Sequence, residues 1–480
     1  MTPRGSCRLD PSGLAATLPI ACVLLLGSWL FAPRAAVAGD WVTYTDETAT
    51  RLVADPSVGA NDIEEKDYIS GDVDQDGDTD LIVVRKQPFT TAGKRRDVLF
   101  MNEDGVLTDR TATLAPDLLV LTNDRDVELV DVDGDLWLDL VTATTFEEQP
   151  RILMNLREVG GVWQGFEHDP DRLPFLISDS GCPPDPGCGP FFCGLGVGDV
   201  TGDGRPDLYF SDYGGALVGD DDDLDDRLLI NDGTGFFTDE TEERVSPDMV
   251  DSVFGTDADI ADMNGDGLLD IVKDTGLGSA GGGGPKVSIL YNDPTNIGHF
   301  TFEQDADTGA PYMVEPADFT QDGRLDLIVV DDGQDKYLIN LGNDAQGHAV
   351  FDSNQVNPSP ATFGFGGNVK FADLDHDGVL DALVADVDTD IPNCGSSHLV
   401  LLQGQGTPPN IHYADPLNGA GRPWNPSTYD VEALHINDDG GLDLVVGACN
   451  GTKVFMGFSL EIFGDGFESG DTAAWDQTAQ

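Results

Sequence analysis

The fold is decided by the stretch Asp72-Val73-Asp74-Gln75-Asp76-Gly77-Asp78-Thr79-Asp80-Leu81-Ile82-Val83-Val84, which the chain repeats in variant form six more times. Carboxylates occupy positions 1, 3, 5 and 9 of this short loop, glycine occupies position 6, and an apolar run follows at once. A hard cation of the size of Ca²⁺ takes about six to eight oxygen ligands from a loop bent sharply enough to converge them. The stretch therefore predicts a calcium-binding turn.

The other copies show that the chain is a repeat protein. They lie at residues 131–139, 199–207, 262–270, 318–326, 373–381 and 435–443, so that a copy begins roughly every 55 to 70 residues. The last copy starts with His435 and has lost its first carboxylate. A regular period of this kind has to be interpreted as one repeat architecture.

The charge of the chain excludes some classes of partner. Asp and Glu number 88 against 25 Lys and Arg, which gives a formal net charge of -63. This balance argues against nucleic acid, whose phosphates are bound by clustered Lys and Arg, and against anionic membrane surfaces. Apolar residues still make up 40% of the chain and come in short, regular runs, which is typical of a folded protein.

The N-terminus has the pattern of a secretory signal. Arg4 and Arg8 precede an apolar stretch over residues 14–31, and Ala36-Val37-Ala38 follows. We expect residues 1–38 to be a signal peptide that is cleaved before Gly39, leaving a secreted or cell-surface protein with no membrane span. An uncleaved membrane anchor is the alternative, because the apolar run is long.

Five cysteines remain after cleavage: Cys182, Cys188, Cys193, Cys394 and Cys449. In an oxidising compartment most of them should pair, and the odd count leaves one over. A zinc site is the alternative for the first three, but their spacing fits no zinc pattern and no histidine is close.

Strand patterns around the loops predict the unit of the fold. One strand runs into each loop and a second leaves it, as at residues 81–84. A third ends in a turn that contains Asn, as at residues 98–102, and a fourth carries Thr-Asp, as at residues 106–111 and 235–241. Four short antiparallel strands per unit form the blade of a β-propeller.

The ends of the chain predict how the ring closes. The seventh unit lacks a Thr-Asp strand, whereas residues 41–48 form a spare one at the start of the chain. Closure with strands from both termini removes an exposed sheet edge. We therefore predict an all-β fold, a seven-bladed β-propeller over residues 39–460 whose last blade is completed by the N-terminal strand, and a tail over residues 461–480.

Strand order also assigns the loops to faces. All the Asp-rich loops are first-to-second turns and share one face of the propeller. Most long insertions, near residues 181–193, 219–226, 278–284 and 417–428, fall on the other face. Long loops on a rigid scaffold are the usual place for binding, so we expect a ligand to bind on the face opposite the calcium loops.

With loops and strands in place, residues 41–459 resemble the FG-GAP/VCBS-repeat β-propellers, the family that also contains the integrin α-subunit head. The resemblance is carried by Asp-x-Asp-x-Asp-Gly-x-x-Asp-Leu at residues 72–81 and by Leu-Ile-Asn-Asp-Gly-Thr-Gly-Phe-Phe-Thr-Asp at residues 229–239. The tail contains Phe467-Glu468-Ser469-Gly470 and Trp475. It looks like a short motif near the ends of secreted proteins of certain Gram-negative bacteria, which suggests a secreted bacterial type.

The resemblance implies that Ca²⁺ is held by the side chains at positions 1, 3, 5 and 9 and by the carbonyl at position 7, which in the first loop is that of Asp78. The implied side-chain ligands are Asp72, Asp74, Asp76, Asp80, Asp131, Asp133, Asp135, Asp139, Asp199, Thr201, Asp203, Asp207, Asp262, Asn264, Asp266, Asp270, Asp318, Thr320, Asp322, Asp326, Asp373, Asp375, Asp377, Asp381, Asn437, Asp439 and Asp443.

Several loops depart from the pattern. Leu136 replaces the position-6 glycine of the second loop, where a left-handed backbone is costly, so this loop is expected to bend differently. Thr201, Asn264 and Thr320 keep an oxygen but lose a charge. His435 is a poor calcium ligand, which predicts a weak or empty seventh site. For any single loop, an Asx-type turn without metal is the alternative.

A catalytic constellation is missing from the sequence. It contains no Gly-x-Ser-x-Gly elbow, His-Glu-x-x-His motif or P-loop, and acidic pairs are too frequent to mark a glycosidase site. The leading hypothesis is a non-catalytic secreted binding or adhesion module, a monomer that takes a protein or glycan ligand and uses Ca²⁺ structurally. The alternatives are a polysaccharide lyase or hydrolase with an axial active site and a structural cell-surface component.

Overall fold

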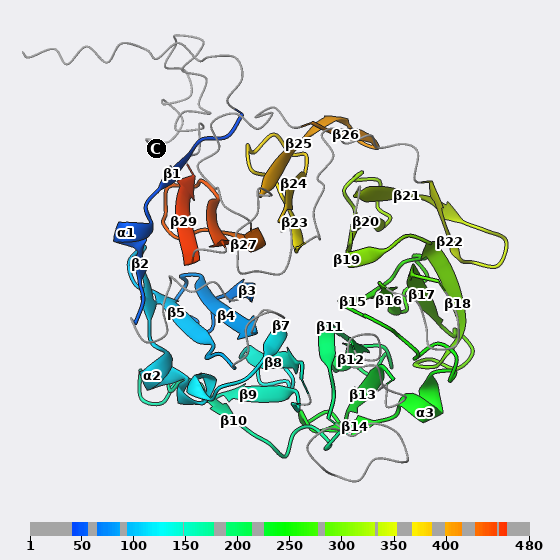
Figure 1. Cartoon of the computed structure of the whole chain (residues 1–480), viewed down its shortest axis with the longest axis horizontal. Helices are drawn as coiled ribbons and strands as arrows, with labels where there is room; N and C mark the ends of the chain where they lie inside the picture. The colour runs from blue at the N-terminus through cyan, green and yellow to red at the C-terminus, as the bar shows by residue number, and fades with distance from the viewer. Residues whose placement is uncertain are drawn as a thin grey trace, which may run out of the picture. The chain divides into compact units, whose positions relative to one another are not determined.

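The protein forms seven β-sheets arranged around a central axis (Figure 1). The structure is a computed structural model that describes residues 41–55, 65–86, 94–146, 148–176, 189–213, 225–276, 284–331, 335–352, 367–385, 399–414, 428–448 and 451–457. Six sheets have four antiparallel strands, and one has a fifth strand added in parallel. The predicted all-β, seven-bladed propeller is therefore confirmed.

The blades are numbered here by their Asp-rich loops. Blade 1 holds β3 (Glu65–Gly71), β4 (Asp80–Lys86), β5 (Val98–Asn102), β6 (Leu107–Asp109) and the added β2 (Leu52–Val53). Blade 2 holds β7 (Asp124–Val130), β8 (Asp139–Thr144), β9 (Arg151–Asn155) and β10 (Phe166–His168). Blade 3 holds β11 (Phe192–Gly198), β12 (Asp207–Asp212), β13 (Arg227–Asn231) and β14 (Phe237–Asp239). Blade 4 holds β15 (Ala258–Ala261), β16 (Asp270–Thr275), β17 (Lys286–Asn292) and β18 (Phe300–Asp307).

The remaining blades complete the ring. Blade 5 holds β19 (Pro311–Ala317), β20 (Asp326–Asp331), β21 (Lys336–Asn343) and β22 (Ala349–Asp352). Blade 6 holds β23 (Val369–Ala372), β24 (Asp381–Val384), β25 (Val400–Thr407) and β26 (Asn410–Ala414). Blade 7 holds β27 (Thr428–Leu434), β28 (Asp443–Ala448), β29 (Gly451–Gly457) and β1 (Tyr44–Asp46). Within the described ranges, the sheets are accompanied by three short helices, α1 (Thr48–Arg51), α2 (Thr111–Leu114) and α3 (Thr241–Arg244), and by the 3-10 helix η1 (Pro116–Leu119).

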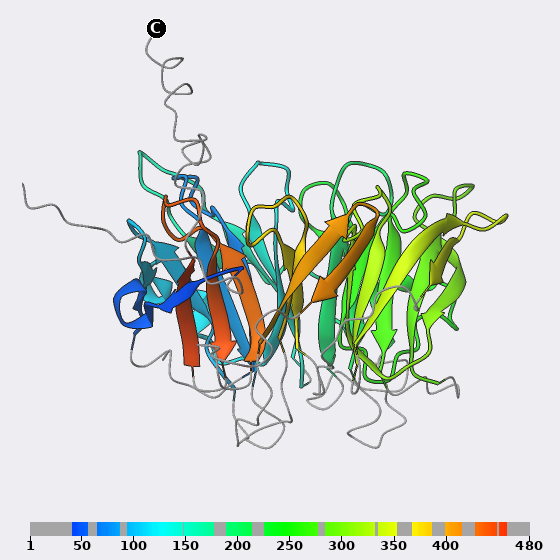
Figure 2. The same cartoon turned by 90° about the horizontal axis from the view of Figure 1, so that it is seen from above.

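The core lies between neighbouring blades. Each blade stands between two others, so its middle strands are covered on both faces and are mostly apolar, as in β5, where all five residues are buried. Between blades 1 and 7, for example, Leu81, Val98 and Phe100 pack against Val445 and Val454. Edge-on, the strands run between the two faces of the molecule (Figure 2). The loops that join first to second strands therefore share one face.

The N-terminal strand belongs to blade 7. β1 pairs antiparallel with β29, with Tyr44 opposite Gly457 and Asp46 opposite Phe455. This strand is shorter than the predicted 41–48, because Thr48 already begins α1. The Asp46 carboxylate causes the change of conformation, since it accepts hydrogen bonds from the backbone N–H and the hydroxyl of Thr48, at 3.0 and 2.7 Å.

The same Asp-x-Thr turn shortens two other predicted strands. The segments 106–111 and 235–241 are strands only as far as Asp109 and Asp239. Each aspartate then accepts two hydrogen bonds from the threonine that starts α2 or α3, Thr111 or Thr241. The expectation of strand through these threonines is wrong.

Other expectations fall outside the described residues. These are the signal peptide (1–38), the tail (461–480), most of the predicted recognition insertions, and Cys182, Cys188, Cys394 and Cys449. Cys193 is described and is buried in β11. Among the described residues, no helix is long and apolar enough to cross a membrane.

Candidate metal centres

The aspartate at position 9 anchors each loop to its blade. In the first loop, Asp80 accepts hydrogen bonds from the backbone N–H of Val73 (3.2 Å) and, with its other oxygen, from that of Asn102 at the end of β5 (2.9 Å). In all seven blades the position-9 aspartate accepts an equivalent pair of hydrogen bonds, one from a backbone N–H of its own loop and one from a backbone N–H of the third strand. Position 9 is therefore buried and fixed in orientation.

The aspartate at position 1 holds the bend. Asp72 accepts hydrogen bonds from the backbone N–H groups of Asp76 (3.1 Å) and Gly77 (3.1 Å). Loops one to six share this arrangement. The position-5 carboxylate accepts a hydrogen bond from the N–H at position 7 in every loop. These bonds turn the backbone inward and bring positions 1, 3 and 9 together.

Position 6 is left-handed in all seven loops, which explains the glycine. Its φ is 101° at Gly77 and 81° to 88° at the other five glycines. Leu136 in the second loop adopts the same conformation, with φ 73°, and is 82% exposed. The expectation that this loop bends differently is wrong: the leucine accepts the strain because its side chain points into open solvent.

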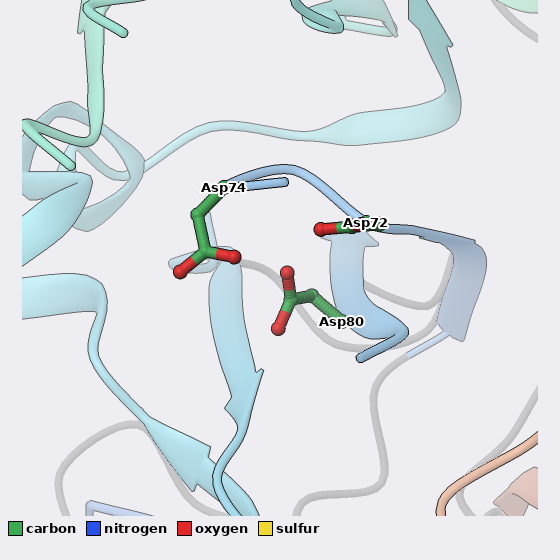
Figure 3. A group of neighbouring side chains, drawn as sticks. All are labelled: Asp72, Asp74 and Asp80. Carbon is green, nitrogen blue, oxygen red and sulfur yellow. The ribbon is translucent and has the colours of Figure 1, made fainter. Parts of the chain in front are cut away.

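Three loops bring three carboxylates together. Oxygens at positions 1, 3 and 9 lie within 4.8 Å of one another in loops one, two and six. In the first loop, the Asp74 and Asp80 carboxylates point toward each other, with that of Asp72 beside them (Figure 3). The three groups are Asp72, Asp74 and Asp80; Asp131, Asp133 and Asp139; and Asp373, Asp375 and Asp381. Each of these groups could hold a metal ion.

The electrostatics of the groups fit a cation. Burial, together with the charges of Asp74 and Asp76, raises the pKa of Asp80 to about 8. Burial likewise raises the pKa of Asp139 to about 7 and that of Asp381 to about 8. In the second loop, one oxygen of Asp133 is buried and accepts no hydrogen bond from the described residues. Hard oxygen donors with unneutralised charge are the donor set that Ca²⁺ takes.

Loops three to five keep the bend but not three carboxylates. Position 3 is Thr201, Asn264 or Thr320. The Thr201 hydroxyl donates to Asp199 (3.3 Å), and the Asn264 amide oxygen accepts from the Asp266 N–H (3.0 Å). Loops three to five therefore offer a neutral oxygen at position 3, and a site there would carry one negative charge less.

The seventh loop differs most. His435 replaces the position-1 aspartate, and its Nδ1 lies 2.9 Å from the carbonyl oxygen of Gly441 in the same loop. Asn437 and Asp439 accept hydrogen bonds from the N–H groups of Asp439 and Gly441, at 3.0 and 2.9 Å. The loop is therefore closed by its own hydrogen bonds, and the histidine ring stands where the other loops have a carboxylate.

Arginine side chains reach two loops. Arg157 pairs with Asp135 and lies 3.5 Å from Asp133 in the second loop. Arg324 pairs with Asp322 in the fifth. Both involve the position-5 carboxylate, so these two loops carry part of their counter-charge within the protein.

Sequence reasoning missed a link from five of the loops to the next blade in the described part of the chain. In these blades an asparagine at or near the end of the third strand is buried, and its amide donates to the position-2 carbonyl of the preceding blade's loop. Asn231 donates to Val132 O (2.9 Å) and also to Pro206 O of its own loop (3.0 Å). Asn102, Asn155, Asn292 and Asn340 likewise donate to the position-2 carbonyl of the preceding blade's loop. The recurring Asn after the third apolar strand was the available signal.

Comparison with known proteins places this geometry in a class. A seven-bladed propeller with an Asp-rich turn in each blade is the fold that the structure defines. The family model for the FG-GAP-like repeat matches residues 199–272 and 318–384, which contain the third to the sixth loops. The chain is thus a β-propeller with FG-GAP-like repeats.

The chain was also compared with solved structures and with curated proteins. One similar solved structure is that of an Agrocybe aegerita lectin, described by its specific recognition of non-reducing terminal N-acetylglucosamine; it is 16% identical, covers 82% of this chain and 86% of its own, and has a TM-score of 0.42. A likeness of that degree decides neither ligand nor site. No curated protein matches this chain significantly.

Proposed function

We propose that the protein is a secreted calcium-binding propeller that acts as a non-catalytic binding or adhesion module for a protein or glycan ligand. The observation that carries the proposal is the convergence of three carboxylates in loops one, two and six. Convergent carboxylates repel each other and are costly unless a cation joins them. Their recurrence at the same three positions of a repeated loop favours a role for metal in the scaffold.

The chemistry of the donors favours Ca²⁺. Bound Ca²⁺ would supply a divalent charge shared among carboxylate and carbonyl oxygens. Positions 1 and 3 lie in the turn and position 9 begins the second strand, so this set ties the turn to the blade. The position-9 aspartate also contacts the third strand, as Asp80 does with Asn102. A metal in this place stabilises the fold and leaves the opposite face open for a ligand.

The opposite face is the proposed binding surface. The chain leaves β12 at Asp212 and enters β13 at Arg227, and it leaves β16 at Thr275 and enters β17 at Lys286. These strand ends lie away from the Asp-rich loops, because strands two and three of a blade join on the other face. The same proposal holds that the protein is exported by means of its signal peptide, that it is then released or attached to the cell surface, and that it is a monomer.

A ligand screen tests the function. The purified protein in 10 mM Ca²⁺ is applied to glycan arrays and used in pull-downs, alongside the variant Asp74→Asn/Asp133→Asn/Asp375→Asn. We expect specific binding by the wild type and weaker binding by the variant when the scaffold is calcium-dependent. Failure to bind any glycan or protein in either Ca²⁺ or EGTA contradicts the module. Turnover on a polysaccharide panel favours the enzyme instead.

A further inference from the structure

The axis of the propeller holds a second set of carboxylates, which the metal loops do not use. A cavity of about 60 Å³ lies between the innermost strands of blades 1 to 6. Side chains of a strand alternate, so the positions five and three residues before a loop share one side of the innermost strand. In blade 2 these positions are Asp126 and Glu128, and both line the cavity. The cavity is far smaller than the roughly 300 Å³ of ligand pockets.

The side chains five residues before the loops form one layer around the axis, and this layer joins neighbouring blades. An aspartate of one innermost strand accepts a hydrogen bond from the backbone N–H of the next one. The three bonds are Asp126 to Leu195 N (2.7 Å), Asp257 to Val314 N (2.9 Å) and Asp430 to Tyr68 N (2.7 Å). A fourth member of this layer, Asp67, accepts from the side-chain amide of Asn368 of blade 6. These aspartates close the ring from the inside.

The side chains three residues before the loops form a second layer, which contains four more carboxylates. They are Glu128, Asp259, Glu315 and Glu432. Lys370 is the cation in this layer, and its Nζ lies 4.0 Å from a Glu432 oxygen. Ser70 also donates to Glu432, at 2.6 Å. For Glu128, Asp259 and Glu315, the described residues offer no backbone hydrogen bond.

The two layers carry too much negative charge to ionise fully. Their eight carboxylates face two cations, Lys370 and Arg125, and the other titratable groups in the described lining are Cys193 and Tyr68. Burial, and then the charge of neighbouring carboxylates, raises the pKa of Asp126 and that of Asp259 well above the usual range. Burial would lower the pKa of Lys370, but the carboxylates around it raise that pKa, so Lys370 stays charged.

We propose that these axial carboxylates form a proton-linked lock, in which bound protons relieve the repulsion between them and so hold the innermost strands of the blades together. The ring is then most stable in mild acid and loosens as the pH rises. The proposal is independent of the loops and of the ligand, because no axial residue belongs to a metal group.

The direction of the effect follows from the raised pKa values. Burial raises the pKa of Glu128 to about 8, that of Glu315 to about 7 and that of Asp257 to about 6, whereas unfolded carboxyls titrate near pH 4. The folded protein therefore binds more protons than the unfolded chain. The stability so gained is fully present below about pH 4 and is lost as the pH rises through the range of about 6 to 8.

The test compares thermal melts from pH 5.5 to 8.5 at a fixed, saturating Ca²⁺ concentration. The variant Glu128→Gln/Asp259→Asn/Glu315→Gln removes axial charge without removing a backbone hydrogen bond. The control Glu242→Gln/Glu243→Gln/Asp248→Asn removes three exposed acids from the rim. We expect the Tm of the wild type and the control to fall by roughly 10 °C over this range, and that of the axial variant to fall by about a third as much.

Proton release on unfolding gives a second readout. Calorimetry at pH 7 in buffers of different ionisation enthalpy should give roughly three protons for the wild type and about two fewer for the axial variant. Equal pH slopes in wild type and variant overturn the proposal. If the triple variant does not fold, Glu128→Gln alone must release about one proton fewer, and an unchanged count overturns the lock.

Discussion

Replacement of Asn231 by alanine tests the link between loops and blades. This side chain is 2% exposed. It donates to Val132 O of the preceding blade (2.9 Å) and to Pro206 O (3.0 Å), and its oxygen accepts from Gly233 N (2.9 Å) and Gly235 N (3.1 Å). Each buried bond contributes about 1 kcal/mol net, so the loss of four lowers the free energy of unfolding by about 3 to 4 kcal/mol.

Urea denaturation followed by tryptophan fluorescence, at constant Ca²⁺, measures the effect. The matched control is Asn343→Ala, which removes an exposed asparagine that makes one bond, to Asn264 O (2.6 Å). We expect the control to change stability by less than about 0.5 kcal/mol. Equal midpoints for the two variants would refute the reasoning, because the buried asparagines would then contribute nothing beyond local turn structure.

Three further tests follow from the contacts within and between blades. Leu136→Gly should stabilise the protein by about 1 kcal/mol, because it removes the strain of a leucine in the left-handed conformation. Gly267→Leu should destabilise the protein by a similar amount. Urea midpoints that shift in the same direction for both variants would contradict this. Gly194→Ala should destabilise the protein by several kcal/mol, because a Cβ there would lie 2.5 Å from the backbone of the next blade. The control is Gly284→Ala, whose Cβ would meet no atom within 4 Å and which should leave the Tm of a thermal melt unchanged. Lys273→Met leaves its buried aspartate partner unneutralised and should lower stability by about 3 kcal/mol in urea, and an unchanged midpoint would count against that ion pair.

The repeat made the blades and loops predictable. Position 9 is an aspartate before an apolar run in every copy, and this local pattern has one geometric solution, a turn between two buried strands. The left-handed backbone at position 6 also follows from the glycines. Leu136 shows the limit, because the hydrogen bonds of Asp131 to the loop N–H groups impose the bend whatever residue occupies position 6.

What the sequence did not reveal depends on contacts between blades. The amide of Asn231 reaches a carbonyl 99 residues away, and Asp430 reaches a backbone N–H 362 residues away. Such bonds exist only once the ring has closed, so no local pattern specifies them. A trace of the axial set was nonetheless visible as Asp126-Val127-Glu128, Asp257-Ala258-Asp259 and Asp430-Val431-Glu432, each at the same distance before a loop.

The most direct test of the central claim is a thermal melt of the purified protein in EGTA and again in 10 mM Ca²⁺. Sites with Kd of about 10⁻⁴ to 10⁻³ M would each add about 1.4 to 2.7 kcal/mol at this concentration. We predict a large upward shift of the Tm in the wild type that is mostly lost in Asp74→Asn/Asp133→Asn/Asp375→Asn. An unchanged Tm would mean that the Asp-rich loops hold their turns without metal, and the calcium assignment would be wrong.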